Sequence, residues 1–212
     1  MKNLLLVSLV CVLIGCSTAY SQHKSEKGWV SIFDGKTLSG WKAAENPGTF
    51  SVDDGAIVVA GPRAHLFYEG PVNDHNFRNF EWKALVKTTP GSNSGMFIHT
   101  AYQETGWPSQ GYEIQVNQTH TDWRKTGSVY GKQDVKETFV KDDEWYTEQI
   151  TVKGNQVTVL INGKVINSYT EPESISQGTG TQKLSNGTIA LQGHDPKSKV
   201  YFKDIQVRVL PD

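Results

Sequence analysis

Apolar and polar residues alternate with a period of two through most of the chain, and the longer period of an amphipathic helix is hard to find. The clearest alternation covers residues 157–161 and 164–169, which flank the pair Asn162-Gly163. Both central residues of a type I′ turn need a positive φ, so an Asn-Gly pair between alternating segments predicts a β-hairpin. The pattern favours an all-β protein with antiparallel strands.

Other alternating segments are separated by equally short turn signals. Gly154-Asn155 joins a segment over 145–152 to the hairpin. We expect further strands over 29–33, 50–52, 56–59, 77–87, 94–100, 112–116, 188–192 and 199–209. Ten or more strands are more than an immunoglobulin-type sandwich needs, so the pattern predicts a jelly-roll β-sandwich of two antiparallel sheets. We find no internal repeat, and we assign residues 28–212 to one domain.

The first residues carry an export signal. Lys2 precedes an apolar run that is too short to span a bilayer as a mature helix, which predicts a signal peptide over 1–15. The run ends in Leu-Ile-Gly-Cys, the pattern of a bacterial lipobox, so we expect Cys16 to be lipidated and residues 16–27 to form a polar tether. The protein is then exported and anchored to the cell envelope by lipid alone. The alternative is an ordinary signal peptide cut later, near Ala19.

Composition narrows the classes of function. The formal net charge is −1 and no run of Lys or Arg is present, which argues against nucleic acid as a partner. Both cysteines, Cys11 and Cys16, lie in the leader, so cysteine chemistry is excluded from the folded domain. We predict no cofactor, and we leave open a structural calcium ion and the oligomeric state. Twenty glycines with 6 Trp and 8 Tyr are common in all-β domains that present aromatic rings to sugars.

Polar residues are densest between positions 90 and 131. Side chains alternate along a strand, so Glu113, Gln115 and Asn117 project from one face of the strand that we expect at 112–116. Either this face is hydrated on the outside of the sandwich, or it lines a wet cleft. Neighbouring Trp and Gly residues favour the cleft, because sugars bind to aromatic rings and to planar polar side chains.

The residue types on this face restrict the reaction. An ordinary glycosidase needs two carboxyl groups roughly 5–9.5 Å apart across the scissile bond. Gln115 occupies the position where a second acid would face the same cleft as Glu113, and a single glutamate suits proton abstraction by a general base. Asp122 in the following loop offers a second carboxyl group, which leaves a conventional glucanase as an alternative.

Histidines and loop tryptophans complete the set of candidates. His194 follows one strand and His99 ends another, and each is either a site residue or a hydrated loop residue. Trp107 and Trp123 lie in loops and are better placed for ligand contact than Trp residues flanked by strand pattern. No two histidines have the helical spacing of metal ligands, although a zinc site from distant strands stays open. The candidate site residues are Asn93, His99, Trp107, Glu113, Gln115, Trp123, Arg124, Tyr130 and His194.

Several short motifs resemble one family. They are IFDGKTLSGW at 32–41, NSGMF at 93–97, GYEIQ at 111–115, TGSVYG at 126–131, WY at 145–146, LING at 160–163, LQGH at 191–194 and VYFKDI at 200–205. From Trp29 nearly to the C-terminus the chain is similar to the 3-keto-disaccharide hydrolase family, which has a concanavalin A-like jelly-roll fold. It departs from that family at His99, where relatives tend to have Arg, and at Lys203-Asp204, where they tend to have Arg-Asn.

The resemblance implies cleavage of a glycoside whose sugar was oxidised at C3 by a separate dehydrogenase. A C3 ketone acidifies the C2 hydrogen, so one base removes it, the C1 substituent leaves by β-elimination, and water adds back. This assigns Glu113 as the base or its main partner, and either His194 or Tyr130 as the group that assists the leaving group. Hydroxyl groups or the developing enolate would be oriented by Gln115, Asn93 and Arg124.

Two further classes of function compete with this enzyme. A non-catalytic carbohydrate-binding lipoprotein would have the same fold, because a fold does not determine a function. A structural or adhesive surface protein is the other, and the polar face of the strand carrying Glu113 argues against it.

Overall fold

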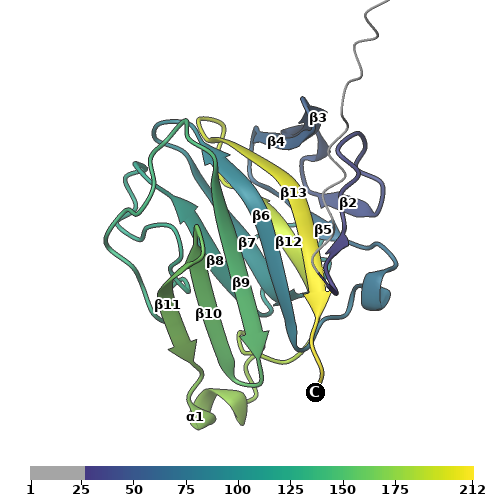
Figure 1. The fold of residues 1–212 in the computed structure, drawn as a ribbon, viewed down its shortest axis with the longest axis vertical. Helices are drawn as coiled ribbons and strands as arrows, with labels where there is room; N and C mark the ends of the chain where they lie inside the picture. Colours follow the sequence, from purple (N-terminus) through teal and green to yellow (C-terminus); the bar gives the residue numbers. More distant parts are fainter. Residues whose placement is uncertain (1–26) are drawn as a thin grey trace, which may run out of the picture.

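The computed structural model describes residues 27–212 and arranges them as two antiparallel sheets packed face to face (Figure 1). The predicted jelly-roll sandwich is therefore confirmed. The predicted signal peptide, the lipidation of Cys16 and nearly all of the tether lie outside the described residues. Within the described range, no helix has the length and apolar character needed to span a membrane.

The larger sheet has eight strands in the order β11-β10-β9-β6-β13-β4-β3, with β1 also paired to β13. Its strands are β1 (Val30–Ser31), β3 (Phe50–Asp53), β4 (Ala56–Ala60), β6 (Phe80–Thr88), β9 (Tyr146–Lys153), β10 (Gln156–Ile161), β11 (Lys164–Thr170) and β13 (Lys199–Val209). The predicted hairpin forms between β10 and β11, where Asn162 and Gly163 both have positive φ, as a type I′ turn requires.

The smaller sheet has five strands in the order β2-β5-β12-β7-β8. Its strands are β2 (Trp41–Ala44), β5 (Ala64–Tyr68), β7 (Asn93–Thr100), β8 (Tyr112–Asn117) and β12 (Thr188–Gly193). Two short 3₁₀ helices, η1 (Pro47–Thr49) and η2 (Val72–His75), and one helix, α1 (Glu173–Ser176), lie in the connections. The alternation did not predict β2, which is only four residues long, or β5, whose residues are buried on both faces and so do not alternate.

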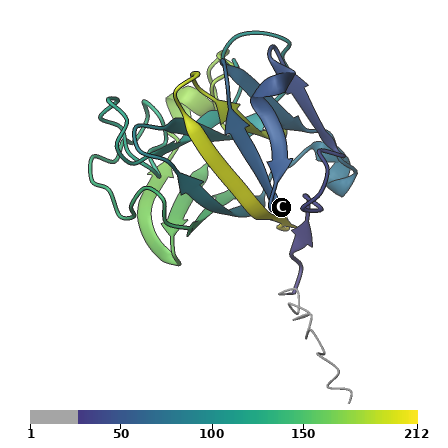
Figure 2. The ribbon, with the colours of Figure 1, turned by 90° about the horizontal axis from the view of Figure 1, so that it is seen from above.

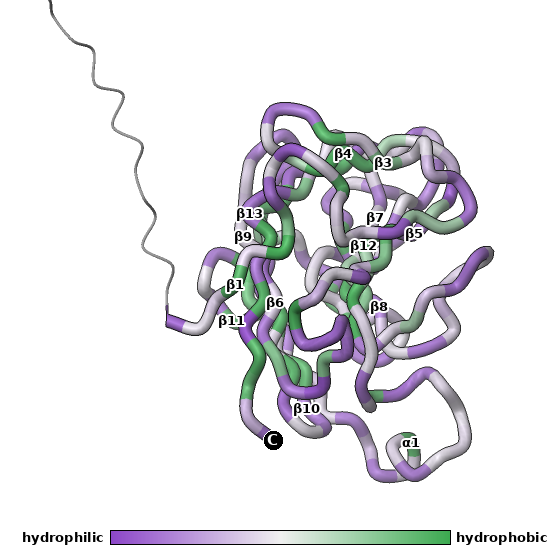
Figure 3. Tube along the Cα trace, turned by 90° about the vertical axis from the view of Figure 1, so that its right-hand side faces the viewer, coloured by the Kyte–Doolittle hydropathy of each residue, from purple (hydrophilic) through white to green (hydrophobic). Residues whose placement is uncertain are grey.

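The core lies between the two sheets. Trp82, Ile150 and Phe202 from the larger sheet are completely buried there. Figure 3 shows the hydrophobic segments concentrated in strands and the hydrophilic ones in connecting loops. Among the tryptophans flanked by strand pattern, Trp29, Trp41 and Trp82 are buried, whereas Trp145 is 37% exposed and its ring packs against the amino group of Lys203.

One face of the smaller sheet packs against the core. The opposite face lies toward the loops before and after β8, which are the teal loops at the left of Figure 2. On β8, Ile114 belongs to the core, so its neighbours Glu113 and Gln115 point to the opposite face. On β12, Leu191 belongs to the core and Gln192 points the other way. The outer face of the smaller sheet therefore collects polar side chains from non-consecutive strands.

The position of β8 is set by the turn at its start and by pairing along its free edge. At its start Gly111 has a φ of +75°, and a Cβ there would collide with the carbonyl oxygen of Ile98. Along its edge the backbone of Gln115 hydrogen-bonds to that of Ser128, and the Tyr130 N–H donates to the carbonyl of Glu113 at 3.0 Å. This pairing covers an open sheet edge and brings Tyr130 next to Glu113.

Candidate functional site

A cavity of about 380 Å³ opens on the outer face of the smaller sheet. Six of the nine residues proposed from the sequence line it, namely Asn93, Trp107, Glu113, Gln115, Tyr130 and His194. Further lining residues that the sequence analysis did not single out are Phe97, Lys132, Gln182 and Gln192. The strand carrying Glu113 therefore lines a cleft rather than a plain hydrated surface.

The carboxyl group of Glu113 lies across the neighbouring strand. From β8 it passes over Gly95 of β7 and accepts a hydrogen bond of 2.8 Å from Nε2 of Gln192 on β12. A Cβ at Gly95 would stand 2.5 Å from Oε1 of Glu113. Only glycine at this position leaves room for the carboxyl group to span three strands.

A second amide holds the same oxygen. With the nitrogen of its amide directed at the surrounding acceptors, Gln115 donates to Oε1 of Glu113 at 2.9 Å and to the carbonyl of Ser94 at 3.2 Å. The amides of Gln115 and Gln192 thus both reach Oε1 of Glu113. We therefore expect Oε2 to be the oxygen that meets a ligand.

Burial sets the charge of this carboxyl group. Loss of water raises the pKa of Glu113 from 4.5 to about 8, because the charged form is poorly solvated at the floor of the cavity. The hydrogen bond from Gln192 and the charge of Arg124 lower this pKa, while the charge of Asp122 raises it. Glu113 is therefore half ionised near pH 8.

His194 faces Glu113's cavity as part of a histidine–aspartate pair. Its Nδ1 lies 2.8 Å from Oδ2 of Asp195, which also accepts a 2.7 Å hydrogen bond from the hydroxyl of Ser198. Burial acts to raise the pKa of Asp195, but hydrogen bonds from Ser198, His194 and the Lys197 N–H hold it at about 2. An ionised carboxylate only accepts, so Nδ1 of His194 carries the proton and Nε2 is left for the cavity.

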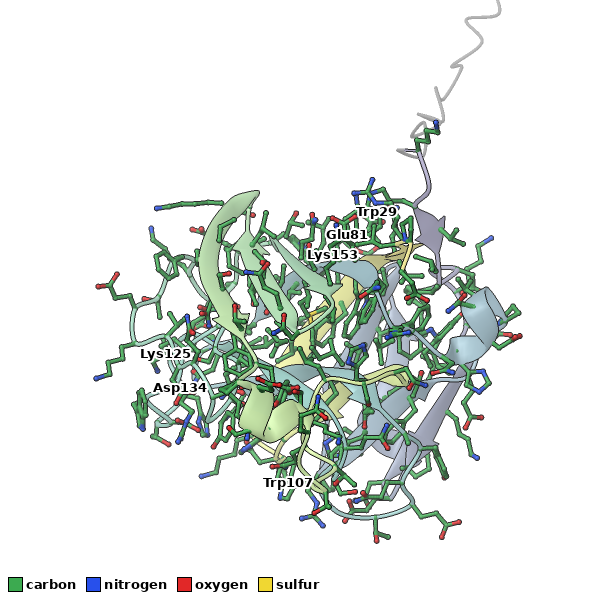
Figure 4. The ribbon with its side chains drawn as sticks, turned by 90° about the horizontal axis from the view of Figure 1, so that it is seen from below. Trp29, Glu81, Trp107, Lys125, Asp134 and Lys153 are labelled. Carbon is green, nitrogen blue, oxygen red and sulfur yellow. The ribbon has the colours of Figure 1, made fainter. Side chains whose placement is uncertain are left out.

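Trp107 forms a wall of the cavity. Its ring lies 5.5 Å from the ring of His194 and 5.6 Å from that of His65, and the guanidinium of Arg63 sits 5.3 Å from its centroid. Arg63 is fixed by a 2.7 Å ion pair with Glu45. Figure 4 shows Trp107 on the opposite side of the molecule from Trp29 and Glu81. The exposed indole is thus held in place and presents an apolar surface to a ligand.

Arg124 lies behind the cavity rather than in its lining. Its guanidinium packs 4.5 Å from the ring centroid of Tyr130, and its Nε donates to Asp134 at 3.3 Å. The hydroxyl of Tyr130 donates to Asp122 at 3.2 Å, and burial together with the charge of Asp122 raises the pKa of Tyr130. Arg124 and Asp122 therefore act on the site through Tyr130 and through their charges.

Two of the proposed residues lie elsewhere. His99 is 1% exposed, donates from Nε2 to the carbonyl of Arg78 at 2.9 Å and accepts the Ser185 N–H at Nδ1. It joins two loops, and both its nitrogens are used. Trp123 is exposed and stacks on Arg124 outside the cavity lining. We therefore leave His99 and Trp123 out of the proposed site.

Sequence reasoning missed Gln192 and Asp195 as site residues. Both stand in the segment 191–195 that also carries His194, and that proximity was the available signal. Gln192 is 79 positions from Glu113 in the chain, so their contact depends on the order of the strands.

One group of described residues has the geometry of metal ligands. One ligand atom each from His120, His194 and Asp195 lie within 4.8 Å of one another. Two imidazoles and one carboxylate suit zinc or another transition metal better than calcium, which takes oxygen ligands. Two atoms of these residues also have partners within the protein, because Nδ1 of His120 accepts the Asp122 N–H at 3.1 Å and Oδ2 of Asp195 lies 2.8 Å from Nδ1 of His194.

The two antiparallel sheets, with a polar, tryptophan-walled cavity on the smaller one, place the protein in the class of concanavalin A-like jelly rolls. Within that class, the chain belongs to the family of the 3-keto-α-glucoside-1,2-lyase-like domain, whose model matches residues 28–208. The resemblance found in the sequence is thereby confirmed.

Relatives of known name or structure agree with this. A Bacteroides thetaiotaomicron protein named 3-keto-disaccharide hydrolase is 32% identical over 231 aligned positions, which cover 86% of this chain and 79% of that protein. A crystal structure from Parabacteroides distasonis, assigned as a glycosyl hydrolase, has a TM-score of 0.71 at 26% identity and covers 87% of this chain and 94% of that one. The β-glucanase of Bacillus licheniformis, at a TM-score of 0.56 and 10% identity over 86% and 97% of the two chains, shares the fold alone.

The carboxyl group of Glu113 should titrate far above an ordinary glutamate, with a midpoint at about pH 8, because its charged form is desolvated. Carbon-13 NMR of protein labelled at the glutamate side-chain carboxyl measures the midpoint, and Glu113→Gln identifies the signal by its loss. A Glu113 signal that titrates below pH 5 would contradict the burial described above.

Proposed function

We propose that this protein cleaves glycosides whose sugar ring carries a ketone at C3, by proton abstraction at C2 followed by elimination. The observation that carries the proposal is the single carboxyl group of Glu113 on the cavity floor, flanked by the amides of Gln115 and Gln192. Support comes from the name of the Bacteroides thetaiotaomicron relative, which describes a hydrolase of 3-keto-disaccharides.

The chemistry needs one base and one group that handles a proton at the glycosidic oxygen. Glu113 takes the C2 hydrogen as a proton, and the electrons of that bond form an enolate with the C3 ketone. The enolate re-forms the ketone as the C1–O bond breaks, which leaves a C1–C2 double bond and a departing oxygen that takes a proton. Addition of water to C1, with return of the proton to C2, completes a net hydrolysis.

The raised pKa of Glu113 suits this step. Carbon acids next to a ketone are weak, and a carboxylate whose pKa is about 8 is a stronger base than one whose pKa is 4.5. A general base is most effective when its pKa lies near the working pH. Burial of Glu113 thus favours proton abstraction over the ionised nucleophile of a retaining glycosidase.

His194 is better placed than Tyr130 to serve the leaving oxygen. The proton of the Tyr130 hydroxyl is directed at Asp122, and the raised pKa of Tyr130 holds that proton firmly. His194 keeps Nε2 toward the cavity while Asp195 orients the ring through Nδ1. In its protonated form His194 donates to the leaving oxygen, and in its neutral form it accepts a proton from the water that adds to C1.

The remaining cavity residues bind and orient the sugar. Asn93 and Lys132 present polar groups to the cavity, and Trp107 offers its ring to an apolar face of the sugar. A conventional glucanase would use Asp122 as its second acid, but Asp122 is outside the cavity lining and holds Tyr130 and the Arg124 N–H. The geometry therefore favours elimination over a two-carboxylate reaction.

Incubation with matched plain and 3-keto glucosides in deuterated water tests the proposal. We expect cleavage of the 3-keto compound alone, deuterium at C2 of the product, and a kcat/KM that rises with pH up to about pH 8, because the base must be ionised. Glu113→Gln should lower kcat by about 10²–10⁴-fold. Mass spectrometry and NMR of the products give both readouts.

Each contrary outcome would indicate a different function or a different catalytic residue. Cleavage of plain β-glucan would indicate a conventional glucanase. Recovery of every glucoside unchanged, with binding that Trp107→Ala abolishes, would indicate a carbohydrate-binding protein. Full activity of Glu113→Gln on a 3-keto glucoside would remove Glu113 from the mechanism.

Gly95→Ala should lower kcat on a 3-keto glucoside by about 10²-fold, because its Cβ displaces the carboxyl group of Glu113 from the position that Gln192 holds. Gly48→Ala is the matched control, since Gly48 is exposed and a Cβ there meets nothing within 4 Å. Steady-state kinetics beside thermal melts measure both variants. Equal activity of the two would mean that the crossing of β7 by Glu113 is irrelevant to turnover.

We also propose that the protein is an exported lipoprotein attached through Cys16, on the basis of the leader sequence. Cys16→Ala should abolish incorporation of labelled fatty acid during expression in a bacterial host. Labelling that persists in this variant would refute attachment at Cys16.

A further inference from the structure

His65 and Gln192 stand directly opposite each other on β5 and β12 of the smaller sheet. Both are buried, at 2% and 1% exposure. Each also carries a buried polar atom that no other described residue hydrogen-bonds, Nε2 of His65 and Oε1 of Gln192. Buried polar atoms are rarely left unmatched in folded proteins, so this pair calls for an explanation.

The side chains of His65 and Gln192 lie next to each other on the outer face of the smaller sheet. Residues directly opposite each other in an antiparallel pair have Cβ atoms about 4.5–5.5 Å apart. The ring of His65 reaches the ring of Phe97 on β7 at 5.3 Å, so it leans over β12, the strand that carries Gln192. Trp107 covers the same imidazole from the cavity side at 5.6 Å. His65 thus packs in the same layer of side chains as Gln192, in contact with the rings of Phe97 and Trp107.

The chemistry of the two atoms is complementary. The amide oxygen of Gln192 only accepts, and a neutral imidazole donates from one nitrogen. A single hydrogen bond between them would satisfy both unmatched atoms, each of which is costly to leave without a partner.

We propose that His65 is a positioning residue for the elimination: its Nε2–H donates to Oε1 of Gln192 and so fixes that amide with its nitrogen toward Glu113. The inference rests on the proposed role of Glu113 as the base. It deepens that role, because it names what determines the orientation of the amide beside the base.

The orientation of this amide matters for the charge of Glu113. With Nε2 toward the carboxyl group, Gln192 stabilises the ionised form and opposes the effect of burial. After a flip, the amide oxygen would face Glu113 and favour the protonated form. A Gln192 that is free to flip would therefore raise the pKa of Glu113 further and reduce the ionised fraction of the base at neutral pH.

The protonation state of His65 does not change at neutral and alkaline pH, so its hydrogen-bond donor is present throughout this range. Burial lowers its pKa to about 4, with the charges of Arg63 and His194 acting in the same direction and that of Glu45 against them. The imidazole is therefore neutral and holds a single proton at neutral and alkaline pH.

The experiment measures the titration of Glu113 by carbon-13 NMR without substrate. Besides the hydrogen bond from Gln192, the charges of Asp122 and Arg124 act on the pKa of Glu113, and Glu113 also interacts with Tyr130; His65→Phe changes none of these three residues. His65→Phe keeps a ring in the aromatic layer but removes the donor. The midpoint of Glu113 should rise by about half a unit to one unit. Phe67→Leu is the control, because Phe67 faces the same side of β5 and packs beside His65 without donating a hydrogen bond.

A double variant tests whether His65 acts through Gln192. Gln192→Leu should itself raise the Glu113 midpoint, and adding His65→Phe to it should give no further rise. A midpoint that His65→Phe leaves unchanged, or a rise that persists in the Gln192→Leu background, overturns the proposal.

Nitrogen-15 NMR of the histidine ring in the unaltered protein gives an independent test that no folding defect can obscure. A proton on Nε2 of neutral His65 supports the proposal, and a proton on Nδ1 overturns it.

Kinetics then connect the positioning to turnover. On a 3-keto glucoside, His65→Phe should shift the pH profile of kcat/KM upward by the same amount as the NMR midpoint and lower activity at pH 7 by about three- to tenfold. An unshifted profile overturns the proposal. Because the NMR midpoint is read without substrate, failure of the unaltered protein to cleave 3-keto glucosides would count against the proposed function alone.

Discussion

The site depends on one constraint, which is that the carboxyl group of Glu113 must lie across β7 and out of bulk water. Gly95 provides the space, since any side chain there would collide with the carboxyl oxygen. The amides of Gln115 and Gln192 supply two hydrogen bonds to Oε1 in place of lost water. Burial with partial compensation produces a carboxyl group that titrates near pH 8, the property on which the proposed chemistry relies.

The packing of the two sheets fixes β8, and with it the position of Glu113. Ile114 anchors β8 in the core from the side opposite to Glu113, and Gly111 sets the conformation at which the strand begins. The segment that ends at Tyr130 pairs along the free edge of β8. A strand that is packed on the core by one face and paired along both edges keeps its polar side chains within the small tolerances that proton transfer requires.

The fold alone does not determine the reaction. The Bacillus licheniformis β-glucanase shares the architecture at 10% identity, and function resides in the residues placed on such a scaffold. In this chain Gln115 stands beside Glu113 where a second acid would otherwise face the cavity, and His194 is oriented by Asp195. These features, together with membership of the family, separate this chain from other jelly rolls.

The sequence by itself determined the all-β class, the turns at the ends of the hairpin strands, the face shared by Glu113 and Gln115, and the family. These are local properties, because strand periodicity and turn conformation depend on neighbouring residues. Tertiary structure alone decided that Gln192 meets Glu113, that Asp195 orients His194 within the cavity, and that His99 is enclosed between loops. His194 and Asp195 are adjacent in the chain, and only the fold places them at the cavity. The contact of Gln192 with Glu113 depends on the strand order β5-β12-β7-β8, in which segments far apart in the chain become neighbours, and no local pattern encodes that order.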